Sequence, residues 1–180
     1  MLSLVGGKWT TFRASAAHLT DRVLELLAQP RVRSTKGMPI GGGAGYPQSE
    51  RARRQWITAH SSGIGFERAA TLLDRYGTVA SEIIDALGDE DTPLASLPGY
   101  SSGELVYLAA TEHVVHLADV LLRRTAIAFT GTATSAVATE IAAVIAPVLG
   151  WYAATQAAEV EAALAAVHAA DPAGAPIAAR

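Results

Sequence analysis

From residue 49 onward, apolar residues recur at the three- and four-residue spacing of α-helices, in successive segments separated by short turns. In the segment 65–76, Leu72 and Leu73 fall on one face, and Gly77 follows as a natural helix stop. Half of the residues are hydrophobic, but many of these are alanine, a strong helix former, and only 6% are aromatic. The pattern predicts a mainly α fold built on a bundle of about five or six helices.

The boundaries of these helices are set by capping residues and by turns. Ser49 is a suitable N-cap for the first helix, Ser101 or Ser102 for the fourth, and Gly150 closes the fifth. An acidic, proline-containing loop is expected at 88–100. The expected helices cover 49–60, 65–76, 78–87, 103–129, 135–149 and 152–168.

The first thirty residues follow a different pattern. Residues 1–5 are largely apolar and predict a short buried strand, which ends at Gly6 and Gly7. The helix that follows carries apolar residues at helical spacing, and Gln29-Pro30 ends it. Such a strand-turn-helix unit is typical of a nucleotide-binding α/β domain.

A linker is expected between this unit and the bundle, because "GMPIGGGAGYP" contains too many glycines and prolines for a regular element. Its glycines do not form a phosphate-binding loop, since no Gly-Lys-Ser/Thr follows and no clear strand precedes. We expect a flexible crossover instead. The expected organisation is a terminal strand-turn-helix at 1–30, a linker at 31–48, a helical domain at 49–168 and a disordered tail at 169–180.

Composition removes several classes of function. The net charge of −3 argues against nucleic acid as a partner. The chain has no cysteine, which excludes disulfide bonds, thiol catalysis and cysteine-ligated zinc. The longest apolar stretch, 137–151, is interrupted by Glu140 and Pro147, and it is shorter than the ~20 apolar residues of a membrane span. We therefore expect no transmembrane segment, and no signal peptide is recognisable.

The helix expected over 103–129 contains the densest group of polar residues. Glu112, His116, Asp119 and Arg123 lie four, three and four residues apart, which places them on one stripe of a helix. The two histidines of "EHVVH" are three residues apart and lack a third ligand, so no metal site is expected. The stripe is interpreted as a solvated face or an interface with another domain, and His113 as a packed core residue.

The turn at the start of the chain is the other candidate site. A helix that begins after Gly6-Gly7 directs backbone N–H groups beyond the strand, where they favour negative charge. Lys8 adds a full positive charge at the same place. In a flavoenzyme, such a cationic tip stabilises the reduced flavin. From the spacing alone, a simple turn remains the alternative.

Several motifs, in order along the chain, resemble those of FAD-dependent glycerol-3-phosphate dehydrogenases. "GGKWTTFR" resembles the signature near the end of their flavin domain, and "PIGGGAGY" resembles their linker. "LLDRYGTVASEII" is similar to a helix with Arg-Tyr-Gly, and "VLGW" to the approach to the last helix. "GELVYLAATEHVVHLADVLLRRTAIAF" is similar to the family's long helix. The resemblance spans residues 2–168, although Ala110 and Thr111 stand where the family often has Arg and His.

The resemblance implies a function for each part of the chain. It implies the C-terminal portion of an enzyme that oxidises sn-glycerol 3-phosphate to dihydroxyacetone phosphate with FAD, inactive without a flavin domain as partner. A non-catalytic helical interaction module or remnant domain is the alternative. Self-association into a homo-oligomer, and a location in the cytoplasm or at the inner face of the membrane, are further expectations. Lys8 is implied to lie near the substrate, and the residues implied to border FAD are Gly6, Gly7, Lys8, Trp9, Thr10 and Thr11.

Overall fold

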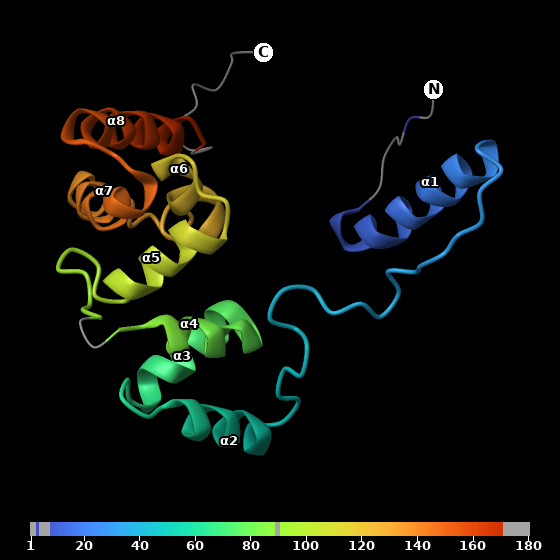
Figure 1. Cartoon of the computed structure of the whole chain (residues 1–180), viewed down its shortest axis with the longest axis horizontal. Coiled ribbons are helices and arrows are strands. Elements are labelled where there is room, and N and C mark those ends of the chain that lie inside the picture. The colour runs from blue at the N-terminus through green and yellow to red at the C-terminus, as the bar shows by residue number, and fades with distance from the viewer. Residues whose placement is uncertain (1–2, 4–7, 89–90, 171–180) are drawn as a thin grey trace, which may run out of the picture.

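The computed structural model describes residues 3, 8–88 and 91–170. Over these residues the chain is mainly helical, which confirms the expected fold class, and the only β-pairing in the same ranges is an isolated bridge between Pro93 and Ser101. Helices α2 to α8 gather into one body, and α1 lies apart from them (Figure 1). The elements are η1 (Trp9–Thr11), α1 (Phe12–Leu26), α2 (Glu50–His60), α3 (Phe66–Tyr76), η2 (Gly77–Val79), α4 (Ala80–Ala86), α5 (Ser102–Thr111), α6 (Leu117–Asp119), the π-helical turn η3 (Val120–Arg124), α7 (Ser135–Leu149) and α8 (Ala153–Ala170).

Helices α2, α3 and α4 form the first part of the bundle. Ser49 caps α2 as expected, and its hydroxyl accepts a hydrogen bond from the N–H of Ala52 at 3.2 Å. Gly77, with φ of +60°, ends α3. Leu72 and Leu73 are fully buried, so the predicted inward face of α3 is confirmed. The buried residues of this part are Ile57, Ala69, Leu72, Leu73, Ala80 and Ile83.

The larger core lies among α5, α6, α7 and α8. Helix α7 begins at the N-cap Thr134, whose hydroxyl accepts from the N–H of Val137, and it ends at Gly150 in the left-handed conformation. It packs against both α5 and α8. Fully buried residues of this core include Leu105, Leu117, Val120, Leu121, Ile127, Ile141 and Ile145. No helix in the described ranges is both long enough and apolar enough to cross a membrane.

The single helix expected over 103–129 is wrong, because the structure contains three shorter elements there. Helix α5 ends at Thr111, and the next helical residue is Leu117. His113 has φ of +52° and is exposed, so the expected packed histidine is also wrong. Histidine and β-branched valine are weaker helix formers than alanine or leucine, and the interval 112–116 is rich in them. Periodicity alone did not reveal the break.

A buried carboxylate joins the two parts of the bundle. Glu104 of α5 is fully buried and accepts hydrogen bonds from Arg68 at 2.6 Å and from Arg75 at 2.9 Å, both on α3. The hydroxyl of Tyr76 also donates to it, at 2.6 Å. Burial, and then the negative charge of Glu104, raise the pKa of Tyr76 far above its ordinary value, so the phenol stays protonated. We call these four residues the Glu104 cluster.

A second carboxylate holds the loop before α5 against α7. Glu140 accepts the backbone N–H groups of Ala95, at 2.7 Å, and of Ser96, at 2.8 Å, as well as the Ser96 hydroxyl. The Ser96 hydroxyl and these backbone donors lower the pKa of Glu140 below its ordinary value. The residue that interrupts the apolar stretch in the sequence is therefore a loop anchor.

The N-terminal part consists of helix α1 and an irregular segment that runs back along it. Helix α1 has no buried residue. After it, Arg31 contacts the carboxylate of Asp21 at 2.5 Å and the carbonyl of Ala17 at 2.7 Å. Arg13 reaches the hydroxyl of Thr35 at 3.4 Å. We call residues 8–35 the N-terminal unit; the strand expected at 1–5 lies outside the described residues, apart from Ser3.

Residues 27–49 contain no helix or strand, as expected of a linker, but they are not a free crossover throughout. Gly42 is buried, and its carbonyl accepts hydrogen bonds from the N–H of Thr78 at 2.8 Å and from its hydroxyl at 3.0 Å. The linker therefore contacts the bundle at this point, and its expected flexibility stays a prediction. At the other end of the bundle, α8 reaches Ala170, and the expected tail at 171–180 lies outside the described residues.

Candidate functional site

The described part of the predicted flavin site lies at the start of α1, while Gly6 and Gly7 lie outside the described residues. Lys8 is extended, with φ of −94° and ψ of 150°, and η1 begins immediately after it. The carbonyl of Lys8 accepts hydrogen bonds from the N–H and the hydroxyl of Thr11, both at 2.9 Å. These bonds fix the turn into α1. Lys8, Trp9, Thr10 and Thr11, which we call the tip, are all exposed.

Two aromatic rings lie beside the cation. Trp9 is 88% exposed and Phe12 is 53% exposed, and their ring centroids are 6.0 Å apart. Exposed apolar side chains that lie together can form an interaction surface. The tip therefore combines a positive charge with an open apolar surface.

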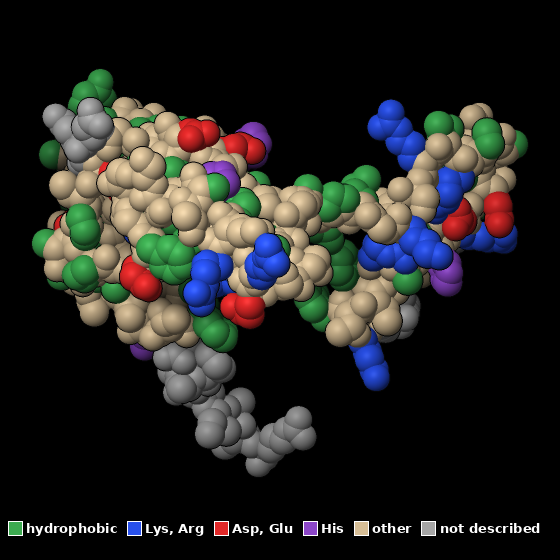
Figure 2. Space-filling model, turned by 90° about the horizontal axis from the view of Figure 1, so that it is seen from below, with side chains coloured by type: hydrophobic (Ala, Val, Ile, Leu, Met, Phe, Trp, Pro, Cys, Tyr) green, Lys and Arg blue, Asp and Glu red, His purple; other side chains and the backbone are tan. Residues whose placement is uncertain are grey.

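The electrostatics of the N-terminal unit favour an anion. No acidic residue lies in the first turn of η1 or α1, so no carboxylate competes for the positive end of the helix dipole. Residues 8–36 contain six basic side chains against two acidic ones, although the whole chain has a net charge of −3. Figure 2 shows Lys and Arg side chains gathered over α1 and the segment after it. The segment that carries the tip is therefore positively charged as a whole.

The predicted polar stripe of Glu112, His116, Asp119 and Arg123 does not form a stripe, because the helix is broken between Glu112 and His116. Arg123 does pair with Asp119, at 2.9 Å, as the spacing predicted. Asp119 also accepts the N–H groups of Val115, at 3.1 Å, and of His116, at 2.9 Å. The polar residues hold together the start of α6 and are not gathered around a cavity.

Glu159 of helix α8 is an unexpected partner for His116. The Nδ1 of His116 lies 2.9 Å from one carboxylate oxygen of Glu159, and the other carboxylate oxygen accepts the N–H of Leu117 at 2.9 Å. Partial burial by itself would raise the pKa of Asp119. The backbone N–H groups that Asp119 accepts and the charge of Arg123 have the larger combined effect, so the pKa of Asp119 is lowered. The hydrogen bond with Glu159, and then its charge, raise the pKa of His116 above 6.5.

This contact predicts a pH dependence of stability. Because the pKa of His116 is raised in the folded protein, its contribution is complete below the ordinary value of 6.5 and is lost as the pH rises through the folded value. Urea unfolding above pH 6.5 should therefore show a loss of stability with rising pH that His116→Gln removes. His113→Gln, at an exposed neighbouring position, should keep the slope of the parent. Equal slopes in all three proteins would contradict the prediction.

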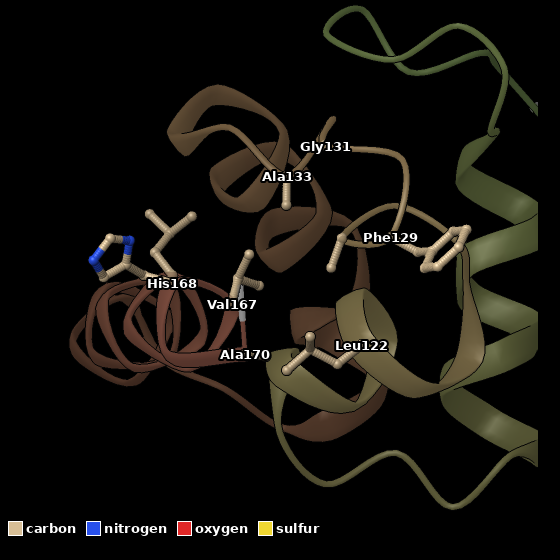
Figure 3. A pocket seen from close by; sticks show the side chains of 9 residues that line it. Leu122, Phe129, Gly131, Ala133, Val167, His168 and Ala170 are labelled. Carbon is tan, nitrogen blue, oxygen red and sulfur yellow. The ribbon is translucent and has the colours of Figure 1, made fainter. Parts of the chain in front are cut away.

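The cavity beside the end of α8 does not bring reactive groups together. A cavity of about 670 Å³ lies between the end of α8 and the loop before α7, with Val167 and Ala133 facing one another across it and His168 at its edge (Figure 3). None of the residues predicted as a site lines it. Within the described ranges, no group of three or more His, Asp or Glu side chains is arranged to hold a metal ion.

The described residues thus form a helical bundle preceded by a cationic helix tip. Residues 33–156 match the family described as the C-terminal domain of alpha-glycerophosphate oxidase. The match covers more than half of the chain, so the chain belongs to this family. The tip lies outside the matched residues.

Curated relatives point to the same enzymes. Glycerol-3-phosphate dehydrogenase 2 of Mycobacterium tuberculosis H37Rv is 33% identical over 163 residues, which cover 86% of this chain and 27% of the relative. The enzyme of Mycobacterium leprae named glycerol-3-phosphate dehydrogenase is 30% identical over 156 residues, covering 84% of this chain and 26% of the relative. The aerobic glycerol-3-phosphate dehydrogenase of Bacillus subtilis 168 is 28% identical over 138 residues, covering 69% and 24%. The chain thus spans about a quarter of the length of these relatives, and the resemblance to glycerol-3-phosphate dehydrogenases is confirmed.

Proposed function

We propose that this chain is the helical C-terminal portion of an FAD-dependent glycerol-3-phosphate dehydrogenase, which oxidises sn-glycerol 3-phosphate to dihydroxyacetone phosphate. The observation that carries the proposal is the family match over residues 33–156, together with relatives that bear this name. In this proposal the catalytic groups belong mainly to a flavin domain, and the bundle flanks that domain. The chain alone has no turnover.

The tip is the part of the chain that reaches the cofactor. Bound FAD would supply hydride acceptance, and positive groups beside N1 and the C2 carbonyl of the flavin would stabilise its reduced form. The first N–H groups of a helix have no intrahelical partner, and Lys8 is an exposed cation at the same end. These groups would border the flavin with Gly6, Gly7 and Trp9 to Thr11, and Lys8 would also attract the substrate phosphate. The residues present fit an anionic group.

The flavin domain is also the partner proposed for the exposed apolar side chains of the N-terminal unit. Trp9 is 88%, Leu26 is 64% and Leu27 is 62% exposed, and a flavin domain that packs there would remove them from water. Without that domain, the same surface favours self-association. We propose a location in the cytoplasm or at the inner face of the membrane, where such enzymes meet their electron acceptor.

The direct test is reconstitution with a flavin domain. The chain is mixed with the Mycobacterium tuberculosis relative from which the residues aligned with this chain have been deleted, and the flavin absorption band and dye reduction with sn-glycerol 3-phosphate are recorded. Activity in the mixture, absent from either protein alone, is expected. A chain that neither binds the truncated relative nor changes its activity would support the alternative, a non-catalytic helical module. That alternative is favoured by one observation, that the bundle has its own buried core.

Lys8→Gln is predicted to impair the reconstituted enzyme. The change removes the only full charge within the tip, and the loss of one preorganised charge-stabilising group reduces turnover by about 100-fold. The reduction potential of the flavin should fall as well, because the reduced form loses its cation. Steady-state dye reduction and a redox titration measure the two effects. Lys36→Gln carries the same change of charge on the linker, and equal losses in both variants would contradict a specific role for Lys8.

A further inference from the structure

The backbones of Gly42 and Gly77 lie so close together that neither residue leaves room for a Cβ, although thirty-four residues separate them in the sequence. A Cβ added to Gly42 would lie 1.9 Å from the carbonyl oxygen of Tyr76, and one added to Gly77 would lie 2.3 Å from the carbonyl oxygen of Gly42. Both residues also have positive φ, +53° and +60°. Neither position accepts a side chain while this contact is intact.

Hydrogen bonds from Thr78 complete the contact. Its N–H and hydroxyl both donate to the carbonyl of Gly42, and the hydroxyl also lies 2.7 Å from the carbonyl of Ala44. Two successive turns of the linker are thus held by one residue at the junction of α3 and α4. We call residues 42–46 the strap.

On the bundle side of this contact, the side chain of Tyr76 is held by the Glu104 cluster. Tyr76, whose carbonyl faces Gly42, directs its hydroxyl to the buried Glu104, which Arg68 and Arg75 also hold. A residue bound at both its backbone and its side chain has little freedom to follow the linker. The strap is therefore attached to a turn that the Glu104 cluster also holds.

The linker between the strap and the N-terminal unit has none of these contacts. Met38 is 59% and Ile40 is 71% exposed, and a side chain added at Gly37 or Gly41 would meet open space. The backbone hydrogen bonds of this stretch are local, from Met38 to Thr35 and from Gly43 to Ile40. We call residues 36–41 the joint.

We infer that the strap fixes the linker to the bundle, so that the N-terminal unit moves relative to the bundle only at the joint. Six free residues give an end-to-end distance of about 13 Å, at 5–6 Å times the square root of their number. Without the strap, the free segment would extend to Ser49, where α2 begins. The strap thus limits the region in which the tip lies. This inference goes beyond the proposed function and does not depend on it.

Electron paramagnetic resonance distance measurements on the full chain test the inference. The chain has no cysteine, so pairs of introduced cysteines carry spin labels at unique positions. Ala44→Cys with Thr139→Cys measures across the strap, and His18→Cys with Thr139→Cys measures across the joint; all three positions are exposed. We expect a narrow distribution for the first pair and a spread of about 13 Å for the second. Equal widths for the two pairs would overturn the inference.

Gly42→Ala tests the contact itself, since the added Cβ meets the carbonyl of Tyr76. The strap should be released, and the Ala44–Thr139 distribution should widen to about 12 Å, as for five free residues. Gly37→Ala is the matched control, because Gly37 has φ of +73° and open space around it, and its distribution should stay narrow. Helical circular dichroism should be unchanged in both variants. A narrow distribution in Gly42→Ala, or a loss of the helical signal, would overturn the assignment of a strap.

Discussion

Glu104→Gln is expected to lower the free energy of unfolding of the bundle by about 3–5 kcal/mol, because it removes the only carboxylate of a buried ion cluster. Arg68 and Arg75 lie 2.6 and 2.9 Å from this carboxylate, and with glutamine they would keep their charges without a counter-charge. Two guanidinium groups would then repel one another in a partly buried position. Urea unfolding, followed by helical circular dichroism, measures the change.

Glu161→Gln provides the comparison for this experiment. Glu161 is exposed on α8, so the same chemical change should alter the free energy of unfolding by less than about 0.5 kcal/mol. If Glu104→Gln were equally mild, the Glu104 cluster would not hold α3 and α5 together. Tyr76→Phe, which removes one of the three donors and leaves both charges paired, should fall between the two.

Leu121→Ala is expected to destabilise the chain by about 2–5 kcal/mol, the range for a fully buried leucine whose loss leaves a cavity. Leu121 has no exposed surface. It lies in η3 and belongs to the larger core. Its carbonyl also accepts the N–H of Ala128 at 3.1 Å, so the π-helical turn and the following loop share this residue. The midpoint of urea unfolding measures the loss.

The neighbouring leucine is a matched control for Leu121. Leu122 is half-buried and lines the cavity beside α8, so Leu122→Ala should cost clearly less than Leu121→Ala. Equal losses would mean that η3 does not orient the two side chains as described. The pair therefore tests the π-helical register as well as the packing.

The elements that the sequence predicted correctly are those with local signals. Ser49, Gly77 and Gly150 mark helix boundaries through their own side chain or lack of one: α2 begins after Ser49, and α3 and α7 end at Gly77 and Gly150. The restart of the helix at Leu117 has one local signal, Asp119, which accepts the N–H groups of Val115 and His116, and one distant contact, the N–H of Leu117 to Glu159. A carboxylate that lies 42 residues away is not visible in a helical pattern.

The candidate sites also differ in whether their signals are local in the sequence. The cationic helix start was predicted from Lys8 and the residues after it, and the structure places them exposed and next to each other, while its role toward FAD remains a prediction. The Glu104 cluster was not predicted as a cluster, although Glu104, Arg75 and Tyr76 all occur in motifs of the family. Two of these residues lie on α3 and one on α5, so only the packing of the helices brings them together.

The meeting of Gly42 and Gly77 has an evolutionary consequence. Each glycine excludes a side chain from the other, so a first substitution at either position is disadvantageous and a second one at the partner gives no relief. The two positions should therefore change only in lineages that abandon the contact altogether. In such lineages we expect insertions and deletions to accumulate between α1 and α2, because nothing would then constrain the length of that connection.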